Sequence, residues 1–140
     1  MERKIRFKII LKDYSSQPFS SIDEELSFIL QSIGFFEHID KNKTAFSLFK
    51  EIMLASEENK AFTSTELSQM VGMSRGSVLN HLDNMLESKL IVKDGRYYIP
   101  RSKSLSQIIN EMESDTEQLF KRLKLMAKKI DRELGFREDL

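Results

Sequence analysis

A chain of 140 residues with 40% hydrophobic side chains can build the core of one domain, with room for attached segments. Its 22 basic and 22 acidic residues cancel, which argues against a strongly basic nucleic-acid binder, and its lack of cysteine excludes disulfides and thiolate metal sites. Because the apolar runs are too short to span a bilayer and the charged N-terminus has no secretory h-region, we expect a cytoplasmic protein without a membrane segment.

The first forty residues predict a strand followed by a helix. Apolar and basic residues alternate from Ile5 to Leu11, which is the period of a half-buried strand with a basic outer face. Ser21 and Glu24 then form a capping-box pattern, and Gly34 would end the helix that follows. The apolar residues that make this helix amphipathic are Ile22, Leu26, Ile29, Leu30 and Ile33.

Residues 1–39 would form an extension of the main domain. Phe35 and Phe36 give it a large apolar anchor. The extension could lengthen a dimer interface, add a strand to a sheet or bind a protein partner. Its basic strand face is more typical of a solvated edge strand guarded by lysines than of a nucleic-acid contact.

A second helix is predicted after the extension and would open a domain spanning residues 40–101. Asp40 or Asn42 can cap it, and its pattern continues through Ala55. The apolar residues at helical spacing that would face the core are Ala45, Leu48, Phe49 and Ile52.

Two short helices separated by a tight turn follow. Thr63 and Glu66 form a capping box, and Gly72 stands where a left-handed residue would end the first helix. Ser74 is a good N-cap for the second helix, residues 74–88. The buried face of the first helix would be Leu67, Met70 and Val71, and that of the second Val78, Leu82, Met85 and Leu86.

A β-hairpin is predicted directly after these helices, over residues 91–99. Lys89 closes the preceding helix, and Leu90 to Val92 form the first strand. Asp94-Gly95 is the strongest two-residue turn signal, typical of a type I′ turn. The return strand runs from Arg96 to Ile99, and Pro100 ends it because proline cannot donate to a sheet ladder.

The distribution of charge is more informative than the total. Residues 60–103 hold 7 basic and 4 acidic side chains, a net charge of +3, whereas residues 1–59 have −2 and residues 104–140 have −1. The positive excess therefore falls on the two short helices and the hairpin, as contact with phosphates requires. Because the excess is small, we expect useful affinity only from a dimer.

The last segment, residues 102–140, predicts one long helix that ends at Gly135. Its apolar residues repeat with alternating steps of three and four from Ile109, the a/d seam of a coiled coil. The proposed dimerisation seam consists of Leu105, Ile109, Met112, Leu119, Leu123, Met126 and Ile130, with Thr116 as a weak central position. Ile108, Phe120, Ala127 and Leu134 widen the stripe. A single helix folded back on its own chain is the alternative.

The segment SRGSVLNHLDNMLESKLIVKDGRYYIP resembles the recognition helix and wing of ArsR- and MarR-type transcription regulators of archaea and bacteria. The matching features are Ser74 at the helix start, the His81-Leu82 pair, Leu86, the strand Leu90-Ile91-Val92, and Arg96-Tyr97-Tyr98. The resemblance covers about a third of the chain. It implies a mainly α fold with a small β-hairpin wing, that is, an α+β winged helix-turn-helix, and a homodimer that binds double-stranded DNA.

The winged-helix interpretation assigns the nucleic-acid contacts to the 74–88 helix and to the hairpin. Arg75, Ser77 and Asn80 would contact bases or nearby phosphates, and Asn84 lies on the same predicted face. Ser74, His81, Lys93 and Arg96 would contact the sugar-phosphate backbone. The missing cysteines and the absence of histidine from the last helix depart from metal-sensing relatives, so we expect no metal site and no cofactor.

Other classes of function remain possible from the residues alone. A winged helix can also serve as a protein-docking subunit of a transcription or chromatin assembly. An RNA-binding adaptor would need exposed stacking aromatics, for which Tyr97 and Tyr98 are the only candidates. No Gly-rich phosphate loop, HExxH, GxSxG or CxxC motif is present, so an enzyme is the least favoured class.

Overall fold

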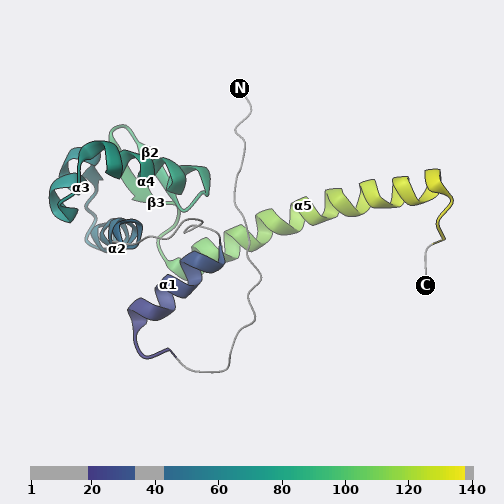
Figure 1. The fold of residues 1–140 in the computed structure, drawn as a ribbon, viewed down its shortest axis with the longest axis horizontal. Coiled ribbons are helices and arrows are strands. Elements are labelled where there is room, and N and C mark those ends of the chain that lie inside the picture. Colours follow the sequence, from purple (N-terminus) through teal and green to yellow (C-terminus); the bar gives the residue numbers. More distant parts are fainter. Residues whose placement is uncertain (1–18, 34–42, 138–140) are drawn as a thin grey trace. The chain divides into compact units, whose positions relative to one another are not determined.

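The computed structural model describes residues 19–33 and 43–137, and Figure 1 shows their fold. These residues form five helices and a small three-stranded antiparallel sheet, an α+β arrangement that is mainly helical. They fall into two compact units that divide between Lys103 and Ser104. The predicted strand at Ile5 to Leu11, the Phe35-Phe36 anchor, and Gly34, Asp40 and Asn42 lie outside the described residues.

Helix α1, Ile22–Ser32, confirms the predicted amphipathic helix of the extension. Ser21 Oγ accepts a hydrogen bond from the Glu24 amide at 3.2 Å, while Glu24 Oε2 accepts from the Ser20 amide at 2.9 Å. The returning capping bond therefore reaches one residue further back than in the usual capping box. Hydrogen bonds from the backbone and then from the side chain of Ser20 hold the pKa of the Glu24 carboxyl below its ordinary value.

One residue of the apolar pattern of α1 is exposed to solvent. Ile22 is 81% exposed, whereas Leu30 is fully buried. The spacing of Ile22 does place it on the apolar side, but it is the first residue of the helix. Periodicity shows which side of a helix is apolar and does not show how far along that side the neighbouring elements extend.

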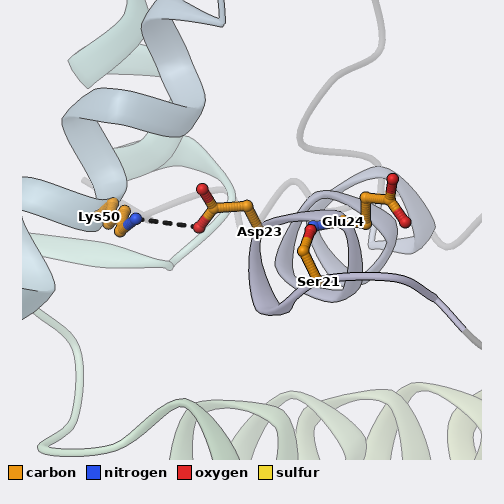
Figure 2. A network of polar contacts seen from close by, with 4 residues as sticks. All are labelled: Ser21, Asp23, Glu24 and Lys50. Carbon is orange, nitrogen blue, oxygen red and sulfur yellow. Dashed lines mark hydrogen bonds and ion pairs between the residues drawn. The ribbon is translucent and has the colours of Figure 1, made fainter.

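An ion pair joins α1 to α2, Thr44–Glu57. Lys50 Nζ lies 2.9 Å from Asp23 Oδ1. Figure 2 shows this pair together with Ser21 and Glu24 at the start of α1. Both side chains remain substantially exposed, so this pair contributes at most about 1 kcal/mol.

Helix α2 forms the centre of the first unit. Its predicted inward residues are all buried, at 0–4% exposure, which confirms the face assigned from spacing: Ala45, Leu48, Phe49 and Ile52. The helix packs on α3 (Ser64–Val71), α4 (Arg75–Glu87) and β3 (Tyr97–Pro100). Its N-cap position is held by Lys43, at a φ of 52°.

The sheet has the order β1-β3-β2, with β3 in the middle. Strand β2, Ile91–Asp94, pairs with β3 as the sequence predicts. Strand β1, Phe62–Thr63, was not predicted, because two residues are too few to show a period. It pairs Phe62 with Tyr98 and Thr63 with Tyr97, and so joins the start of α3 to the hairpin.

Helix α5, Leu105–Leu134, makes up most of the second unit and confirms the single long helix expected there. Ser104 caps its start by accepting from the Gln107 amide at 3.1 Å, and Gly135 ends it at a φ of 78°. None of the helices in the described part of the chain combines the length and apolar character that crossing a bilayer requires.

Candidate nucleic-acid interface

The turn between α3 and α4 is built by local hydrogen bonds. Thr63 and Glu66 form both bonds of the capping box, at 3.2 and 3.1 Å. At the other end of α3 the amides of Gly72 and Met73 both donate to the Ser68 carbonyl. Gly72 adopts a φ of 69°, which glycine accepts without the steric cost that a Cβ would bring.

Helix α4 begins immediately after this turn and is fixed by its apolar face. The Ser74 hydroxyl accepts from the Ser77 amide at 3.2 Å, as the sequence predicts. Val78, Leu82 and Met85 are completely buried, and Leu86 is half-buried. On α3, Leu67 is buried but Met70 is 45% exposed, so the inward placement of Met70 is wrong. Only eight residues long, α3 makes its main apolar contact through one side chain.

Four of the predicted contact residues share one face of α4. Ser77, Asn80, His81 and Asn84 stand at positions i, i+3, i+4 and i+7, which lie on the same side of a helix. Asn80 and Asn84 are exposed, while Ser77 and His81 are half-buried. The face therefore presents two free carboxamides, each with donors and an acceptor, flanked by a hydroxyl and an imidazole.

Arg75 does not belong to that face. It precedes Asn80 by five residues, which places it about 140° around the helix axis. Its Nε donates to Ser64 Oγ at 3.3 Å, and Ser64 is buried at the start of α3. The guanidinium thus links the start of α4 to the start of α3. Its Nη groups make no further hydrogen bond with the described residues. Sequence spacing had grouped Arg75 with Asn80, and this contact gave no signal in the sequence.

The hairpin after α4 has a different turn from the predicted one. Lys89, at a φ of 66°, reverses the chain after α4, and the Leu90 amide donates to the Met85 carbonyl at 3.1 Å. Asp94 pairs with Tyr97, so the two turn residues are Gly95 and Arg96 rather than Asp94 and Gly95.

Only the first turn residue, Gly95, has a positive φ, at 61°. A type I′ turn needs two such residues, so the backbone follows the type II′ pattern instead. Arg96 therefore lies in the turn and not in the return strand.

The two basic residues of the hairpin both lie over tyrosine rings. Lys93 Nζ is 5.5 Å from the centroid of the Tyr98 ring, and the Arg96 guanidinium carbon is 5.7 Å from that of Tyr97. Both cations are exposed, Tyr98 is buried and Tyr97 is 38% exposed. The rings hold the cations at the tip of the hairpin, where they remain available to an anion.

Acidic residues occur on α4 as well, and their position matters. Asp83 and Glu87 are exposed in its second half, whereas residues 75–81 contain no carboxylate. The described residues contain no cluster of three or more His, Cys, Asp or Glu side chains that could hold a metal ion. The first half of α4 is therefore the part of this helix best suited to an anion, while at the hairpin exposed Asp94 stands in the sequence between the cations Lys93 and Arg96.

The predicted dimerisation seam falls into two parts. Met112 is 4% exposed in the isolated chain, and Leu105 and Ile109 are half-buried. The remaining four seam residues are 46–60% exposed: Leu119, Leu123, Met126 and Ile130. Only the second part is free to meet another molecule over most of its surface.

No family model, curated protein or solved structure matches this chain. A function is therefore inferred from the residues themselves and from the geometry that they adopt.

Proposed function

We propose that this protein is a sequence-specific, double-stranded DNA-binding transcription regulator that acts as a homodimer, with a winged helix-turn-helix of the kind found in ArsR- and MarR-type regulators. The observation that carries the proposal is the succession of α3, a three-residue turn, α4 and a hairpin with two exposed cations. A helix-turn-helix presents its second helix to the major groove. A hairpin beside it would lie on the sugar-phosphate backbone as a wing.

The composition of α4 supports its role as the recognition helix. Such helices contact base edges mainly through their N-terminal residues, and this half of α4 carries polar side chains without acids. Exposed Asn80 and Asn84 can each form the bidentate pair that asparagine makes with adenine. Arg75 is held toward α3 by Ser64, so its free Nη groups suit a phosphate better than a base.

The hairpin supplies contacts of a different kind. Lys93 and Arg96 can reach phosphates, which position a protein on the duplex without reading sequence. With only two turn residues, the wing is too short to fill a minor groove. The Ser74 hydroxyl already caps α4, so only its remaining hydrogen-bonding capacity is available for the backbone.

Selection of bound fragments from random duplex DNA, repeated over a series of salt concentrations, tests the proposal. We expect an inverted repeat whose half-sites lie about 34 Å apart, one helical turn, because a dimer would present two copies of α4. Salt-sensitive binding without a motif would contradict sequence-specific regulation. Absence of binding at low salt would contradict DNA binding altogether.

Affinities of single-residue variants for the selected DNA site show which surface of the protein binds it. Asn80→Ala should weaken binding by about 1–3 kcal/mol and relax the sequence preference at one position. Asn110→Ala, an exposed asparagine on α5, is the matched control and should leave affinity unchanged. Lys93→Ala should weaken binding to all sequences alike and reduce the salt dependence.

A protein-docking winged helix is the second candidate function. The observation that favours it is the exposed pair Asp83 and Glu87 on α4, together with Met70, which is 45% exposed on α3. An acidic and partly apolar surface suits a protein partner better than a phosphate backbone. The selection experiment separates the two candidates, because a docking module would recover no DNA.

A further inference from the structure

The second half of α5 presents an uncovered apolar stripe, which we call the outer seam: Leu119, Leu123, Met126 and Ile130. Steps of four, three and four residues separate its members, which is the a/d spacing of a coiled coil, and no polar residue interrupts it. Phe120, Ala127 and Leu134 extend the stripe on one side, at the e positions. A continuous apolar stripe of this length marks an interaction site.

We propose that the outer seam pairs with the outer seam of a second copy of this chain, with the two helices parallel and in register. This inference rests on the homodimer of the proposed function and adds where the copies meet and in which orientation. In register, each seam residue packs against its own counterpart.

The charges around α5 favour a helix over a lipid surface as the occupant. From residue 119 to residue 134 there are six basic side chains and two acidic ones. The basic residues are exposed, and none forms an ion pair with a described residue: Lys121, Arg122, Lys124, Lys128, Lys129 and Arg132. Lys121, Lys128 and Arg132 lie on the side of the helix opposite the seam. A bilayer covering the seam would leave these three cations facing away from its headgroups, whereas a second helix leaves them in water.

The positions beside the seam favour the parallel orientation. Arg122 and Lys129 occupy g positions, which in a parallel pair lie next to e positions of the other helix. There they meet Ala127 and Leu134 of the second copy, and their aliphatic stems can cover these apolar residues while the charges stay in water. No like charges are brought together at the seam.

Antiparallel pairing is disfavoured both when the pair is centred on the outer seam and when it is shifted by one heptad toward Met112. Centring the pair on the outer seam sets Leu119 opposite Ile130. It also brings Arg122 of each copy beside Lys129 of the other, so that two pairs of like charges meet. Shifting the pair by one heptad sets Met126 opposite Thr116 and so places a polar side chain in the seam. The first alignment brings like charges together, and the second pairs an apolar residue with a hydroxyl.

The orientation also affects where the two first units are attached. A parallel pair brings both copies of Ser104 to the same end of the coiled coil. In the antiparallel pair centred on the seam, the starts of the two helices would be about 60 Å apart along the axis, at 1.5 Å per residue. That separation is nearly twice the roughly 34 Å between adjacent half-sites on DNA.

Single-cysteine crosslinking tests the proposal, because the natural chain contains no cysteine. Full-length Leu119→Cys, oxidised mildly at micromolar concentration, should form a covalent dimer on a non-reducing gel. Leu125→Cys is the matched control, since Leu125 is 68% exposed on the other side of the same helix. It should stay monomeric on the gel.

A mixed experiment reports the orientation. Leu119→Cys is combined with an Ile130→Cys chain that carries a size tag. In a parallel pair these positions are 11 residues, or about 16 Å, apart along the axis and cannot be bridged, so only homodimers should form. A heterodisulfide without homodimers would establish the antiparallel pair and overturn the proposal.

Two further outcomes would overturn the second copy as occupant. Equal crosslinking of Leu119→Cys and Leu125→Cys would mean random collision. A monomer by sedimentation that binds vesicles of anionic phospholipid would make lipid the occupant. Crosslinking reports only whether the helices pair. A crosslinked dimer that does not bind DNA would contradict only the proposed function, and DNA binding without a crosslinked dimer would contradict only this inference.

Discussion

The first unit and the second half of α5 use the same helical pattern with opposite results. In the first unit, Leu48, Phe49 and Leu82 are fully buried. In α5, the large apolar residues from Leu119 to Leu134 remain 46–68% exposed. Equal spacing therefore leads to a finished core in one region and to an uncovered surface in the other. The difference teaches that the first unit covers its apolar side chains within one chain, whereas the second half of α5 leaves them uncovered, as the proposed pairing of two copies requires.

The largest effect that separates the two regions is expected from one substitution made in each. Leu82→Ala removes a fully buried side chain and should lower the free energy of unfolding by about 2–5 kcal/mol. Leu123→Ala, at 46% exposure, should change the stability of the dilute monomer by no more than about 0.5 kcal/mol. Urea unfolding followed by circular dichroism measures both.

Concentration is the control for this pair. At high protein concentration, Leu123→Ala should also lower the apparent stability, because a self-associating native state is stabilised by mass action. Leu82→Ala should lower the free energy of unfolding by the same amount at every protein concentration. Identical losses for both variants in the dilute monomer would mean that the outer seam is covered within one chain.

Two glycines that end helices sharpen the comparison at a smaller scale. Gly72 and Gly135 have φ values of 69° and 78°, so alanine at either site would be strained by about 1–2 kcal/mol. Gly72→Ala should destabilise the whole first unit by that amount, since this glycine joins α3 to α4. Gly135→Ala should only fray the last turn of α5. Hydrogen exchange would distinguish a global loss of protection from a local one.

Gly76 should respond in the opposite direction to Gly72. It lies within α4 at an ordinary φ, and a Cβ added there would meet no atom of another element within 4 Å. Gly76→Ala should therefore raise the free energy of unfolding by about 0.5–1 kcal/mol. A decrease in the melting temperature of this variant would show that the first turn of α4 is packed more closely than its surroundings indicate.

The smallest expected effect is the pH response of α1, which lies at the surface of the first unit. The bonds from Ser20 hold the pKa of the Glu24 carboxyl below its ordinary value of 4.5. Because the folded-state pKa is lowered, this contribution to stability is fully present above pH 4.5 and is lost as the pH falls through the lowered pKa.

Carbon-detected NMR titration of the Glu24 carboxyl measures this shift. Ser20→Pro removes the donating amide and should return the pKa toward 4.5, whereas Ser20→Ala keeps the amide and should preserve much of the shift. An unchanged pKa in Ser20→Pro would show that the bond does not form in solution.

Local chemistry accounts for the parts of the fold that could be predicted. Thr63, Ser74 and Ser104 cap helices because their hydroxyls accept from the amides three residues on, a relation contained within one turn. Gly72 and Gly135 end helices for an equally local reason. The inward faces of α2 and α4 followed from spacing alone.

Contacts between distant residues explain what could not be predicted. Strand β1 has two residues and exists because β3 offers its edge to Phe62 and Thr63. The turn at Gly95 and Arg96 follows from the register of the whole hairpin, in which Ile91 pairs with Pro100, nine positions away, and Asp94 therefore with Tyr97. Arg75 reaches Ser64, eleven positions away in the sequence, and so left the face to which its spacing had assigned it.

The sequence by itself determined the order of the helices and the hairpin, the caps of α1, α3 and α4, and the apolar sides of α2 and α4, because these depend on residues within about one turn of each other. Tertiary structure alone decided which apolar sides were covered. It covered Leu82 in the first unit and left the outer seam of α5 exposed, because burial depends on which elements of the folded chain lie beside a helix and on how far they extend along it.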